Sequence, residues 1–422
     1  MKQQMKYKQT EVGMIPENWE VRPIKELGEI KGGKRLPKGD SFSDLKNNYP
    51  YIRVTDLTKH TVNTSNLKYL KPETQRRIKN YTITSNDVYI SIAGTIGLVG
   101  SIPQELNGAN LTENAAKICS IKNVDKKFLI YFLNSQIGKS QINTFVGKST
   151  QPKLALFRIE QIKIPIPPIT EQQSISEVLS TIDTRLDIIE RERQRIERLK
   201  EGIMRKLFEE KKWSVVRLGE IIEFKRGFSY RSDQINSKPI GKRRLFTINN
   251  FSKEGGLKTD AEKIYILDDT KISEIFVIKK NDVFIANTDM SKGLIIGAPL
   301  LMEDDKEALV YSMDLTKLMF DKSKIEPKFL FYFLRLGDIR RKMKMNAQGT
   351  NVLHLNHNLI KNQIEIPLPT LEEQKYIAEI LNTIDKRLDL QEIIKIKTQK
   401  LKKGLMNDLL IGKKRLKEFL KC

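Results

Sequence analysis

Apolar residues recur at steps of four and three along two stretches of the chain. The first stretch has them at Ile175, Leu179, Ile182, Leu186 and Ile189, and the second at Ile377, Leu381, Ile384, Leu388, Leu401, Leu405 and Leu409. This spacing leaves a narrow apolar stripe on one face of an α-helix. A stripe so narrow favours contact with a second helix, so we predict two long helices whose stripes form a shared seam.

The two stretches belong to one repeat with a shift of 202 residues. Ile164-Pro-Ile-Pro-Pro-Ile-Thr-Glu-Gln-Gln173 returns as Ile366-Pro-Leu-Pro-Thr-Leu-Glu-Glu-Gln-Lys375, and Thr181-Ile-Asp-Thr-Arg-Leu-Asp187 returns as Thr383-Ile-Asp-Lys-Arg-Leu-Asp389. The prolines remove backbone donors and keep the chain extended until a helix begins. Thr170, with Gln173 three residues later, has the pattern of a capping box at the start of the first helix.

A generic stripe for coiled-coil dimerisation would give the same periodicity. We favour pairing of the two helices within one molecule, because both stripes are present in the same chain and the segment between them is long enough to fold back. Arg193, Lys200 and Gln391 interrupt the strict heptad, so local shifts of register are expected there.

The repeat also includes the region that precedes each helix. Trp19 with Leu27-Gly28-Glu29-Ile30 is matched by Trp213 with Leu218-Gly219-Glu220-Ile221, and Phe128-Leu-Ile-Tyr-Phe-Leu133 is matched by Phe329-Leu-Phe-Tyr-Phe-Leu334. Short β-like runs lie between these phrases. The pattern predicts an α+β fold with an internal pseudo-twofold repeat: a mixed α/β domain at 1–163, a long helix at 164–212, a second domain at 213–365, and a second helix with a C-terminal tail at 366–422.

The similarity between the two copies is uneven. It is high in the helices and framing phrases, whereas residues 34–80 and 225–275 share almost nothing that can be aligned. We interpret this as one duplicated scaffold that carries two different ligand surfaces.

The charge balance indicates a polyanionic partner. The 422 residues carry a formal charge of +23, with 75 Lys and Arg against 52 Asp and Glu. Each phosphate that a Lys or Arg neutralises releases condensed counterions, although an anionic membrane surface or ribosomal RNA would suit the same charge. Cys119 and Cys422 lack the spacing of a disulfide framework, and neither a signal peptide nor a run of 18 apolar residues is present. We therefore expect a cytoplasmic protein.

Several of these phrases resemble the specificity subunits of type I restriction-modification systems. They are Ile164-Pro-Ile-Pro-Pro with Glu171-Gln172, Ile366-Pro-Leu-Pro with Glu372-Glu-Gln374, Thr-Ile-Asp-x-Arg-Leu-Asp in both helices, and Leu401-Lys-Lys-Gly-Leu-Met-Asn-Asp-Leu-Leu-Ile-Gly-Lys-Lys-Arg415. The resemblance covers essentially the full length, and its specificity lies in the duplicated order of the phrases.

The resemblance implies a non-catalytic subunit that reads a bipartite, asymmetric double-stranded DNA site. Two target recognition domains would each read one half-site, and two antiparallel coiled-coil helices would separate them and dock two methyltransferase subunits. Restriction subunits, which are helicase-nucleases, would join this core. No cofactor is expected on this chain, since S-adenosylmethionine for adenine N6 methylation, ATP and Mg would belong to the partner subunits. Half-sites read from one DNA face would lie about 10 base pairs apart, centre to centre.

The candidates for DNA contact lie mostly in the loops where the copies diverge. In the first domain they are Lys31, Lys34, Arg35, Arg53, Thr55, Lys148, Ser149, Thr150 and Gln151, and in the second Lys225, Arg226, Tyr230, Arg231, Asn249, Asn250, Asn287, Thr288, Lys292, Thr350, Asn351 and His354. Arg suits guanine and Asn or Gln suits adenine, whereas Lys mostly contacts phosphate. Any one exposed Lys or Arg is more often solvated than in contact with a base. The prediction therefore depends on the clustering of these residues.

The sequence contains no complete catalytic or metal-binding motif. Gly147-Lys148-Ser149 resembles the end of a phosphate-binding loop, but the first glycine of that pattern would fall at Ile142. His60, His354 and His357 are too few and too poorly spaced for a zinc site or a triad. The sequence thus favours a recognition module without catalysis or bound metal. The alternative from another class is a basic coiled-coil scaffold or interaction protein that binds DNA without sequence preference.

Overall fold

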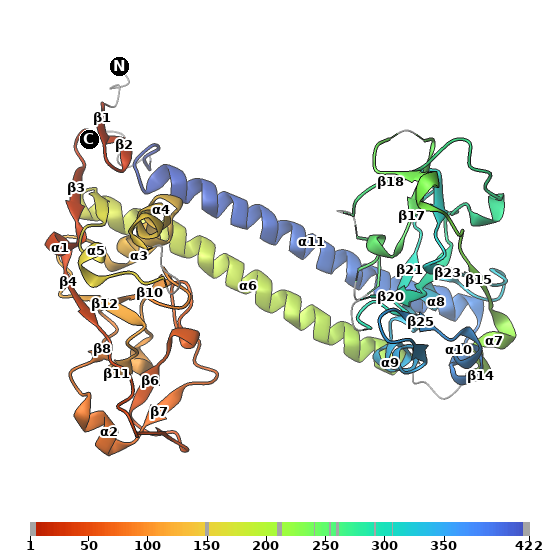
Figure 1. Cartoon of the computed structure of the whole chain (residues 1–422), viewed down its shortest axis with the longest axis horizontal. Coiled ribbons are helices and arrows are strands. Elements are labelled where there is room, and N and C mark those ends of the chain that lie inside the picture. Colours follow the sequence, from red (N-terminus) through yellow and green to blue (C-terminus); the bar gives the residue numbers. More distant parts are fainter. Residues whose placement is uncertain are drawn as a thin grey trace. The chain divides into compact units, whose positions relative to one another are not determined.

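The chain forms two compact units in the computed structural model, which describes residues 6–147, 152–208, 213–239, 241–252, 255–258, 261–290, 293–305 and 307–416. Unit 1 comprises residues Met1–Glu190 with Ile393–Cys422, and unit 2 comprises Arg191–Glu392. Each unit contains a mixed α/β domain and a part of two long helices, α6 (Ile169–Phe208) and α11 (Leu371–Leu409) (Figure 1). Among the described helices, none is long and apolar enough to cross a membrane.

The domain of unit 1 is built on two sheets. Its elements are β1 (Tyr7–Thr10), β2 (Gly13–Pro16), β3 (Glu20–Pro23), α1 (Ile24–Leu27), β4 (Glu29–Gly32), β5 (Phe42–Ser43), β6 (Pro50–Ile52), η1 (Val54–Asp56), β7 (Lys68–Leu70), α2 (Pro72–Arg77), β8 (Thr82–Ile83), β9 (Val88–Ser91), β10 (Val99–Gly100), η2 (Gln104–Leu106), β11 (Ala109–Leu111), β12 (Ala115–Cys119), α3 (Lys126–Asn134), α4 (Gln136–Phe145), α5 (Leu156–Ile159) and β13 (Lys163–Ile166). The sheets have the strand orders β10-β9-β12-β4 and β5-β7-β6-β11-β8, and β13 pairs with β3.

The domain of unit 2 follows the same plan. Its elements are β14 (Ser214–Arg217), α7 (Leu218–Ile221), β15 (Glu223–Arg226), η3 (Ser232–Gln234), β16 (Ile235–Asn236), β17 (Arg243–Phe246), η4 (Ile248–Asn250), β18 (Ile264–Ile266), η5 (Glu274–Phe276), β19 (Val283–Ala286), β20 (Thr288–Asp289), β21 (Pro299–Leu301), β22 (Leu309–Tyr311), β23 (Leu315–Met319), α8 (Pro327–Leu334), α9 (Gly337–Met345), β24 (Ala347–Gln348), β25 (Leu353–Leu355), α10 (His357–Gln363) and β26 (Glu365–Leu368). Its sheets have the orders β15-β23-β19-β21, β16-β18-β17-β22 and β20-β25-β24.

The repeat is more complete in the backbone than in the sequence. The parallel pair β6 and β11 of unit 1 has its counterpart in the parallel pair β17 and β22 of unit 2. Both pairs lie partly in the segments where the two sequences diverge. Backbone pairing depends on extended geometry and burial more than on particular side chains, so the strand order is retained where sequence similarity is lost.

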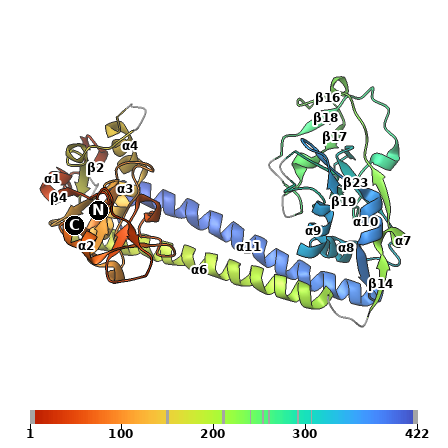
Figure 2. The ribbon, with the colours of Figure 1, turned by 60° about the horizontal axis from the view of Figure 1, so that its bottom comes forward.

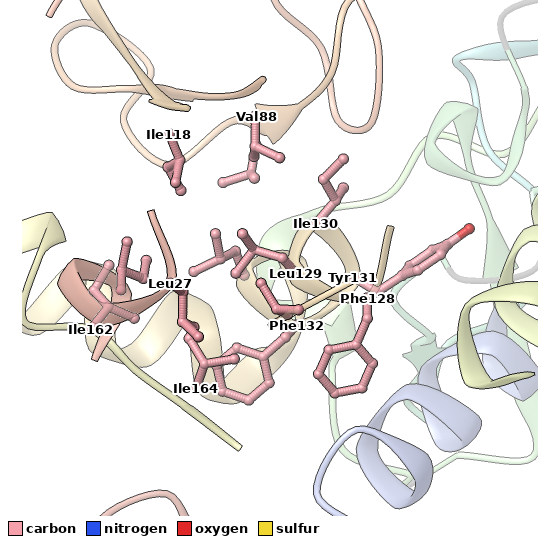
Figure 3. Close-up of a cluster of buried hydrophobic side chains, with 14 of the residues drawn as sticks. Leu27, Val88, Ile118, Phe128, Leu129, Ile130, Tyr131, Phe132, Ile162 and Ile164 are labelled. Atoms are coloured by element: carbon pink, nitrogen blue, oxygen red, sulfur yellow. The ribbon is translucent and has the colours of Figure 1, made fainter. Parts of the chain in front are cut away.

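One largely buried apolar helix contributes to the core of each domain. In unit 1, the Asp125 carboxylate accepts a hydrogen bond from the Phe128 N–H at 2.8 Å and so caps the start of α3. Figure 3 shows Leu129 and Phe132 of this helix packed among side chains from the sheet and from neighbouring segments, including Val88 and Ile118. Burial of a side chain of this size contributes about 1.5–3 kcal/mol. In unit 2, α8 contacts β19 and β21, and Figure 2 shows α8 next to β19.

The start of each long helix fixes its domain through a Glu-Gln pair. In unit 1, Glu171 accepts a hydrogen bond from the Trp19 indole N–H at 3.2 Å, and Gln172 accepts one from the Asp125 N–H at 2.7 Å. In unit 2, Gln374 accepts one from the Glu326 N–H at 2.8 Å. These contacts give a structural reason for the repeated Glu-Gln phrase in the sequence.

A capping box occurs at the start of the second long helix, where none was predicted. The Thr370 hydroxyl accepts a hydrogen bond from the Glu373 N–H at 3.3 Å, and the Glu373 carboxylate accepts one from the Thr370 N–H at 3.0 Å. In the first copy, α6 already begins at Ile169, so Thr170 lies inside the first turn instead of before it. The prediction of Thr170 as the cap was therefore wrong.

The two long helices pair antiparallel within each unit, as predicted. In unit 1, Glu190 of α6 pairs with Lys395 of α11 at 2.7 Å, and Asp183 pairs with Lys402. In unit 2, Arg193 pairs with Glu392 and Lys200 with Asp385. In both units the residue number falls on α11 as it rises on α6. Arg193 and Lys200, which interrupt the heptad, therefore carry ion pairs between the helices.

The predicted seam residues have two kinds of environment. Ile175 and Leu179 are buried in the core of unit 1 together with Leu409, and Ile377 and Leu381 are buried in the core of unit 2. The other four predicted seam residues are half-buried, namely Ile182, Leu186, Ile384 and Leu388. Leu401, which the periodicity placed on the stripe, is 56% exposed, so that prediction was wrong.

Candidate nucleic-acid interface

Four loops of unit 1 meet at one edge of its sheets. Because β6 and β11 run parallel, the loops that follow them leave from the same edge. The Thr112 N–H donates to the Ile52 carbonyl at 3.0 Å, the Lys34 N–H to the Leu111 carbonyl at 2.8 Å, and the Ile92 N–H to the Asn114 carbonyl at 2.8 Å. We define rim 1 as these loops, residues 33–36, 53–56, 92–95 and 112–114.

Unit 2 has the equivalent set of loops. The Phe228 N–H donates to the Tyr311 carbonyl at 2.8 Å, the Ser312 N–H to the Phe246 carbonyl at 2.9 Å, and the Asn287 N–H to the Asp314 carbonyl at 2.7 Å. We define rim 2 as residues 227–231, 247–250, 287–289 and 312–314. The two rims have the same backbone plan and different side chains.

One glycine in each rim allows the close approach of two loops. A Cβ on Gly33 would overlap the carbonyl oxygens of Leu111 and Thr112, and a Cβ on Gly227 would overlap those of Tyr311 and Ser312. Any side chain at either position would push the first loop away from the loop after β11 or β22. The repeated glycine therefore fixes the shape of both rims.

Rim 1 displays basic side chains, several of which have partners within the unit. Arg35 is mostly exposed and pairs with Glu113 at 2.8 Å. The Arg53 guanidinium donates twice to the Asp56 carboxylate and once to the Asn66 carbonyl. Lys34 lies over the ring of Tyr81 at 5.4 Å, and Thr55 is exposed. Lys34, Arg35 and Thr55 are thus displayed to solvent, whereas Arg53 would have to give up internal bonds to contact a base.

The loop after β15 supplies much of the exposed part of rim 2. The Arg226 guanidinium, at the end of that strand, donates to the Met313 carbonyl at 3.0 Å, and Arg231 pairs with Asp233 at 3.2 Å. Tyr230 is half-buried against a small apolar cluster that includes Phe228. Arg226 and Arg231 are both exposed.

The asparagines of rim 2 differ in accessibility. Asn249 is exposed, and its backbone N–H donates to the Thr247 hydroxyl at 3.3 Å. Asn250 is buried, and its side-chain oxygen accepts a hydrogen bond from the Thr247 N–H at 2.9 Å. Arg53 and Asp56 make the same turn in rim 1, where Asp56 accepts from the Arg53 N–H at 2.8 Å. Asn250 therefore holds the loop, and Asn249 is the more available side chain.

Asn287 and Thr288 are also engaged inside unit 2. The Asn287 side-chain oxygen lies 2.7 Å from His357 Nε2, and the Thr288 hydroxyl donates to Asp314 at 3.2 Å. Burial, together with the nearby charge of Arg226, lowers the pKa of His357, so its ring is neutral near pH 7. Sequence reasoning missed the role of His357, because only the fold brings it to Asn287. Both Asn287 and Thr288 are buried, and a base contact would require these bonds to break.

A hairpin extends rim 2. It is formed by β24 and β25, with Thr350 and Asn351 exposed in its turn and His354 exposed on β25 opposite Thr288. The Leu355 N–H joins it to the rim by donating to the Asn287 carbonyl at 3.0 Å. In unit 1, the Leu154 N–H makes the same bond to the Ile92 carbonyl at 2.9 Å.

The remaining candidates lie elsewhere. Lys31 and Lys225 lie on β4 and β15, ahead of the rims, and Lys31 pairs with Glu29 at 2.6 Å. Lys148, Ser149, Thr150, Gln151 and Lys292 lie outside the described residues. Among the described residues, no group of three or more His, Cys, Asp or Glu side chains could hold a metal ion.

The geometry defines a class of protein: a tandem recognition protein with two homologous loop rims, each on a domain that is fixed to the same two helices. The comparisons agree with this class. The family model of the type I restriction modification DNA specificity domain matches residues 16–198 and again residues 210–400. The chain therefore belongs to this family of type I restriction-modification specificity subunits, and its role is DNA sequence specificity.

Relatives and solved structures match nearly the whole chain. The type I restriction enzyme MjaVIII specificity subunit of Methanocaldococcus jannaschii is 27% identical, with 96% of this chain and 95% of the relative covered. The putative MjaX specificity subunit of the same organism is 26% identical, with 97% of each covered. The type I system S subunit of M. genitalium has the same fold, with a TM-score of 0.57 at 18% identity over 93% of this chain and 96% of that subunit.

Proposed function

We propose that rim 1 and rim 2 each read one half of a bipartite, asymmetric double-stranded DNA site. The observation that carries this proposal is the equivalence of the two rims in backbone together with their difference in side chains. Equivalent backbones suit the same kind of ligand, and different side chains suit different sequences. The net charge of +23 favours DNA as that ligand.

The side chains of the rims suit different parts of this task. Arg35 in rim 1 and Arg231 in rim 2 are exposed and can pair with guanine once their surface ion pairs open, which costs little. Asn249 can pair with adenine. The buried groups, such as Asn250 and Asn287, hold the loops that present these residues.

We propose that the chain itself is not a catalyst. Adenine N6 methylation would be carried out by two methyltransferase subunits that hold S-adenosylmethionine, and cleavage by restriction subunits that use ATP and Mg. The repeat supports two copies of one partner, since exposed apolar residues recur 202 positions apart on the long helices. They are Ile188 and Leu390, at 39% and 55% exposure, and Leu199 and Leu401, at 57% and 56%.

Each unit carries one member of both repeated pairs. Ile188 and Leu401 lie in unit 1, and Leu199 and Leu390 lie in unit 2. Exposed leucine and isoleucine at repeated positions suit an apolar interface. We propose that each unit docks one methyltransferase subunit there. In native mass spectrometry, the pair Ile188→Asp and Leu401→Asp should lose one methyltransferase copy and keep the other.

The experiment that tests the proposed function is methylation mapping. The chain is co-expressed with its methyltransferase partner, and N6-methyladenine is located by long-read sequencing. The expected result is one bipartite motif with a spacer that places the half-sites about one helical turn apart. Methylation without such a motif, or DNA binding without sequence preference, would overturn the proposal in favour of a basic scaffold.

A loop exchange assigns each half-site to a rim. Residues 227–231 and 247–250 are replaced by the corresponding loops of another specificity subunit. One half of the motif should change and the other half should stay the same. The matched control replaces the exposed turn at 321–324, which lies outside rim 2, and should leave both halves unchanged.

A further inference from the structure

A cavity of about 830 Å³ lies in unit 1 between the domain and the C-terminal part of α11. Three segments line it: the turn with Lys59 and His60, the start and outer face of α4, and α11 from Gln399 to Asn407. Lysine is the dominant charged residue in its wall, at positions 59, 139, 402 and 403, and none of the lining residues is Asp or Glu.

Few acidic side chains balance the positive charge of the lysines in this cavity. Within the described part of the chain, Lys59, Lys139 and Lys403 form no ion pair, and Lys402 pairs with Asp183 just beyond the lining. Burial and the charge of Lys59 lower the pKa of Lys139, which reflects repulsion between two ammonium groups. The N-terminus of α4, capped by Ser135, also faces the cavity and adds positive potential. An anion would relieve this accumulation of charge.

The equivalent cavity of unit 2 does not share this charge. It measures about 1330 Å³, and carboxylates line it, including Glu197 and Glu201. By the shift of 202 residues, these two glutamates correspond to Gln399 and Lys403 of unit 1. The space between domain and helices is thus common to both units. In unit 2 its basic side chains are balanced by carboxylates, whereas in unit 1 the lining is basic without a carboxylate. Because both units have a cavity at this place, packing of the domain on the helices does not explain why only the cavity of unit 1 lacks carboxylates.

The cavity adjoins rim 1 along the chain. Lys59 follows Asp56, the last residue of the η1 loop of rim 1, by three positions, and the Asn63 N–H holds this turn by donating to the Asp56 carbonyl at 2.8 Å. On the other side, α4 ends at Phe145, and the chain returns to the rim where Leu154 bonds to Ile92. The turn that carries Lys59 thus connects the cavity directly to the η1 loop of rim 1.

We propose that this cavity binds a backbone phosphate of the DNA that flanks the first half-site, with Lys59 and Lys139 as its ligands. This inference rests on the proposed function and adds to it a contact that does not depend on the DNA sequence. It gives unit 1 a stronger electrostatic hold on DNA than unit 2.

The test uses the complex with methyltransferase and a double variant, Lys59→Gln with Lys139→Gln. The matched control is Lys122→Gln with Lys127→Gln. It removes the same charge from exposed positions that do not line the cavity, in the connection from β12 to α3 and in the first turn of α3. DNA binding is titrated over a range of salt concentrations, with the methylated motif and with a scrambled sequence. The variant should bind both DNAs about tenfold more weakly, with a salt slope lower by about 1–2, because each neutralised phosphate contributes about 0.9 to that slope.

A second arm locates the phosphate. Phosphates beside the first half-site are replaced by neutral methylphosphonates. Wild-type protein should lose affinity for this DNA, whereas the variant should show no further loss. If the variant loses as much affinity on the methylphosphonate DNA as the wild-type protein does, the two effects are additive and the proposal is overturned.

Other outcomes are equally decisive. An unchanged salt slope would overturn the proposal, as would loss of methyltransferase association with DNA binding intact, which would assign the cavity to an acidic protein partner. Thermal melting of the variant identifies misfolding, and the single variant Lys59→Gln at an exposed turn then replaces it. If the wild-type complex shows no preference for any bipartite motif, the proposed function fails instead. The salt titration with the scrambled sequence does not depend on that preference and still tests the phosphate contact.

Discussion

The hydroxyl group of Tyr131 on α3 donates a hydrogen bond to the Asp183 carboxylate on α6 at 2.8 Å. Asp183 also pairs with Lys402 of α11, whose ammonium group lies over the Tyr131 ring at 5.5 Å. These three residues, which we call joint 1, come from the domain and from both long helices. Burial, then Asp183, raises the pKa of Tyr131, so its hydroxyl keeps its proton as the donor.

Unit 2 contains the same arrangement, which we call joint 2. Tyr332 of α8 donates to Asp385 of α11 at 3.0 Å, and Lys200 of α6 pairs with the same carboxylate. Asp183 and Asp385 are related by the shift of 202 residues, as are Lys200 and Lys402. Each long helix thus provides the aspartate of one joint and the lysine of the other. The joints fix each domain on the helix pair and thereby the position of its rim.

Asp183→Asn should destabilise unit 1 by about 2 kcal/mol, since hydrogen bonds to charged groups contribute about 1.5–3 kcal/mol and Lys402 would lose its counter-charge. Urea unfolding of the purified chain measures this change. The control is Asp44→Asn, an exposed position in the same unit, which should stay within about 0.5 kcal/mol of wild type. Equal effects of the two substitutions on the free energy of unfolding would show that joint 1 does not stabilise unit 1.

The histidine beside joint 1 should make stability depend on pH. Burial, and then repulsion by Lys402, lower the pKa of His60 to about 4, from 6.5 for an ordinary histidine. Between these two values the unfolded chain binds a proton that the folded chain does not. The contribution of His60 is therefore complete above pH 6.5 and is lost progressively as the pH falls toward 4.

The comparison of wild type with His60→Gln measures this effect. Urea midpoints are recorded at pH 5 and at pH 7, and the midpoint of the variant should fall less between pH 7 and pH 5 than that of wild type. His354→Gln, at an exposed position, is the control and should follow wild type. A variant with the full wild-type dependence would show that His60 is not the group that titrates.

Two equivalent glycines in the long helices offer a gain in stability. Gly202 in α6 and Gly404 in α11 have nothing within 4 Å of where a Cβ would lie. Glycine inside a helix costs about 0.5–1 kcal/mol relative to alanine, so Gly202→Ala and Gly404→Ala should each raise the free energy of unfolding by about that amount. Chemical denaturation checks the gain. Methylation mapping should show an unchanged motif, and a decrease in stability would mean that the helices are distorted at these positions.

The two rim glycines should behave in the opposite way. Gly33→Ala and Gly227→Ala would force a Cβ against backbone carbonyls, and such overpacking costs about 1–3 kcal/mol. In methylation mapping, Gly33→Ala should weaken recognition of the first half-site and Gly227→Ala that of the second. The controls are Gly147→Ala and Gly337→Ala, where the added Cβ meets open space. Loss of both half-sites from a single rim substitution would contradict the assignment of one rim to each.

Much of the fold could be predicted from the sequence because helices and their starts depend on local patterns. The apolar steps at Ile175 and Ile377 and the prolines before them predicted two long helices, and the shift of 202 residues predicted the repeat. The same periodicity could not distinguish a stripe residue that packs from one that does not. Leu401 fits the period and is 56% exposed, because periodicity reports the helix face of a residue and not what packs against it.

The candidate site was predictable in its location and less so in its residues. The divergent loops held most of the residues that form rim 1 and rim 2, since surfaces for different ligands differ where a scaffold is shared. The internal partners of Arg53 and Asn287 come from residues 13 and 70 positions away, Asn66 and His357. No local sequence pattern predicts such a contact. The sequence therefore could not distinguish a side chain that stabilises a loop from one that is accessible to DNA.

The sequence alone determined the tandem order, the two long helices, the basic charge and the family resemblance, because each depends on residue types and spacing along the chain. The tertiary structure decided which lysines are compensated. Lys402 is held by Asp183, whereas Lys59 and Lys139 are brought together beside a cavity without a carboxylate in its lining. Charge compensation depends on distances in space between residues that are far apart in sequence, and folding sets those distances.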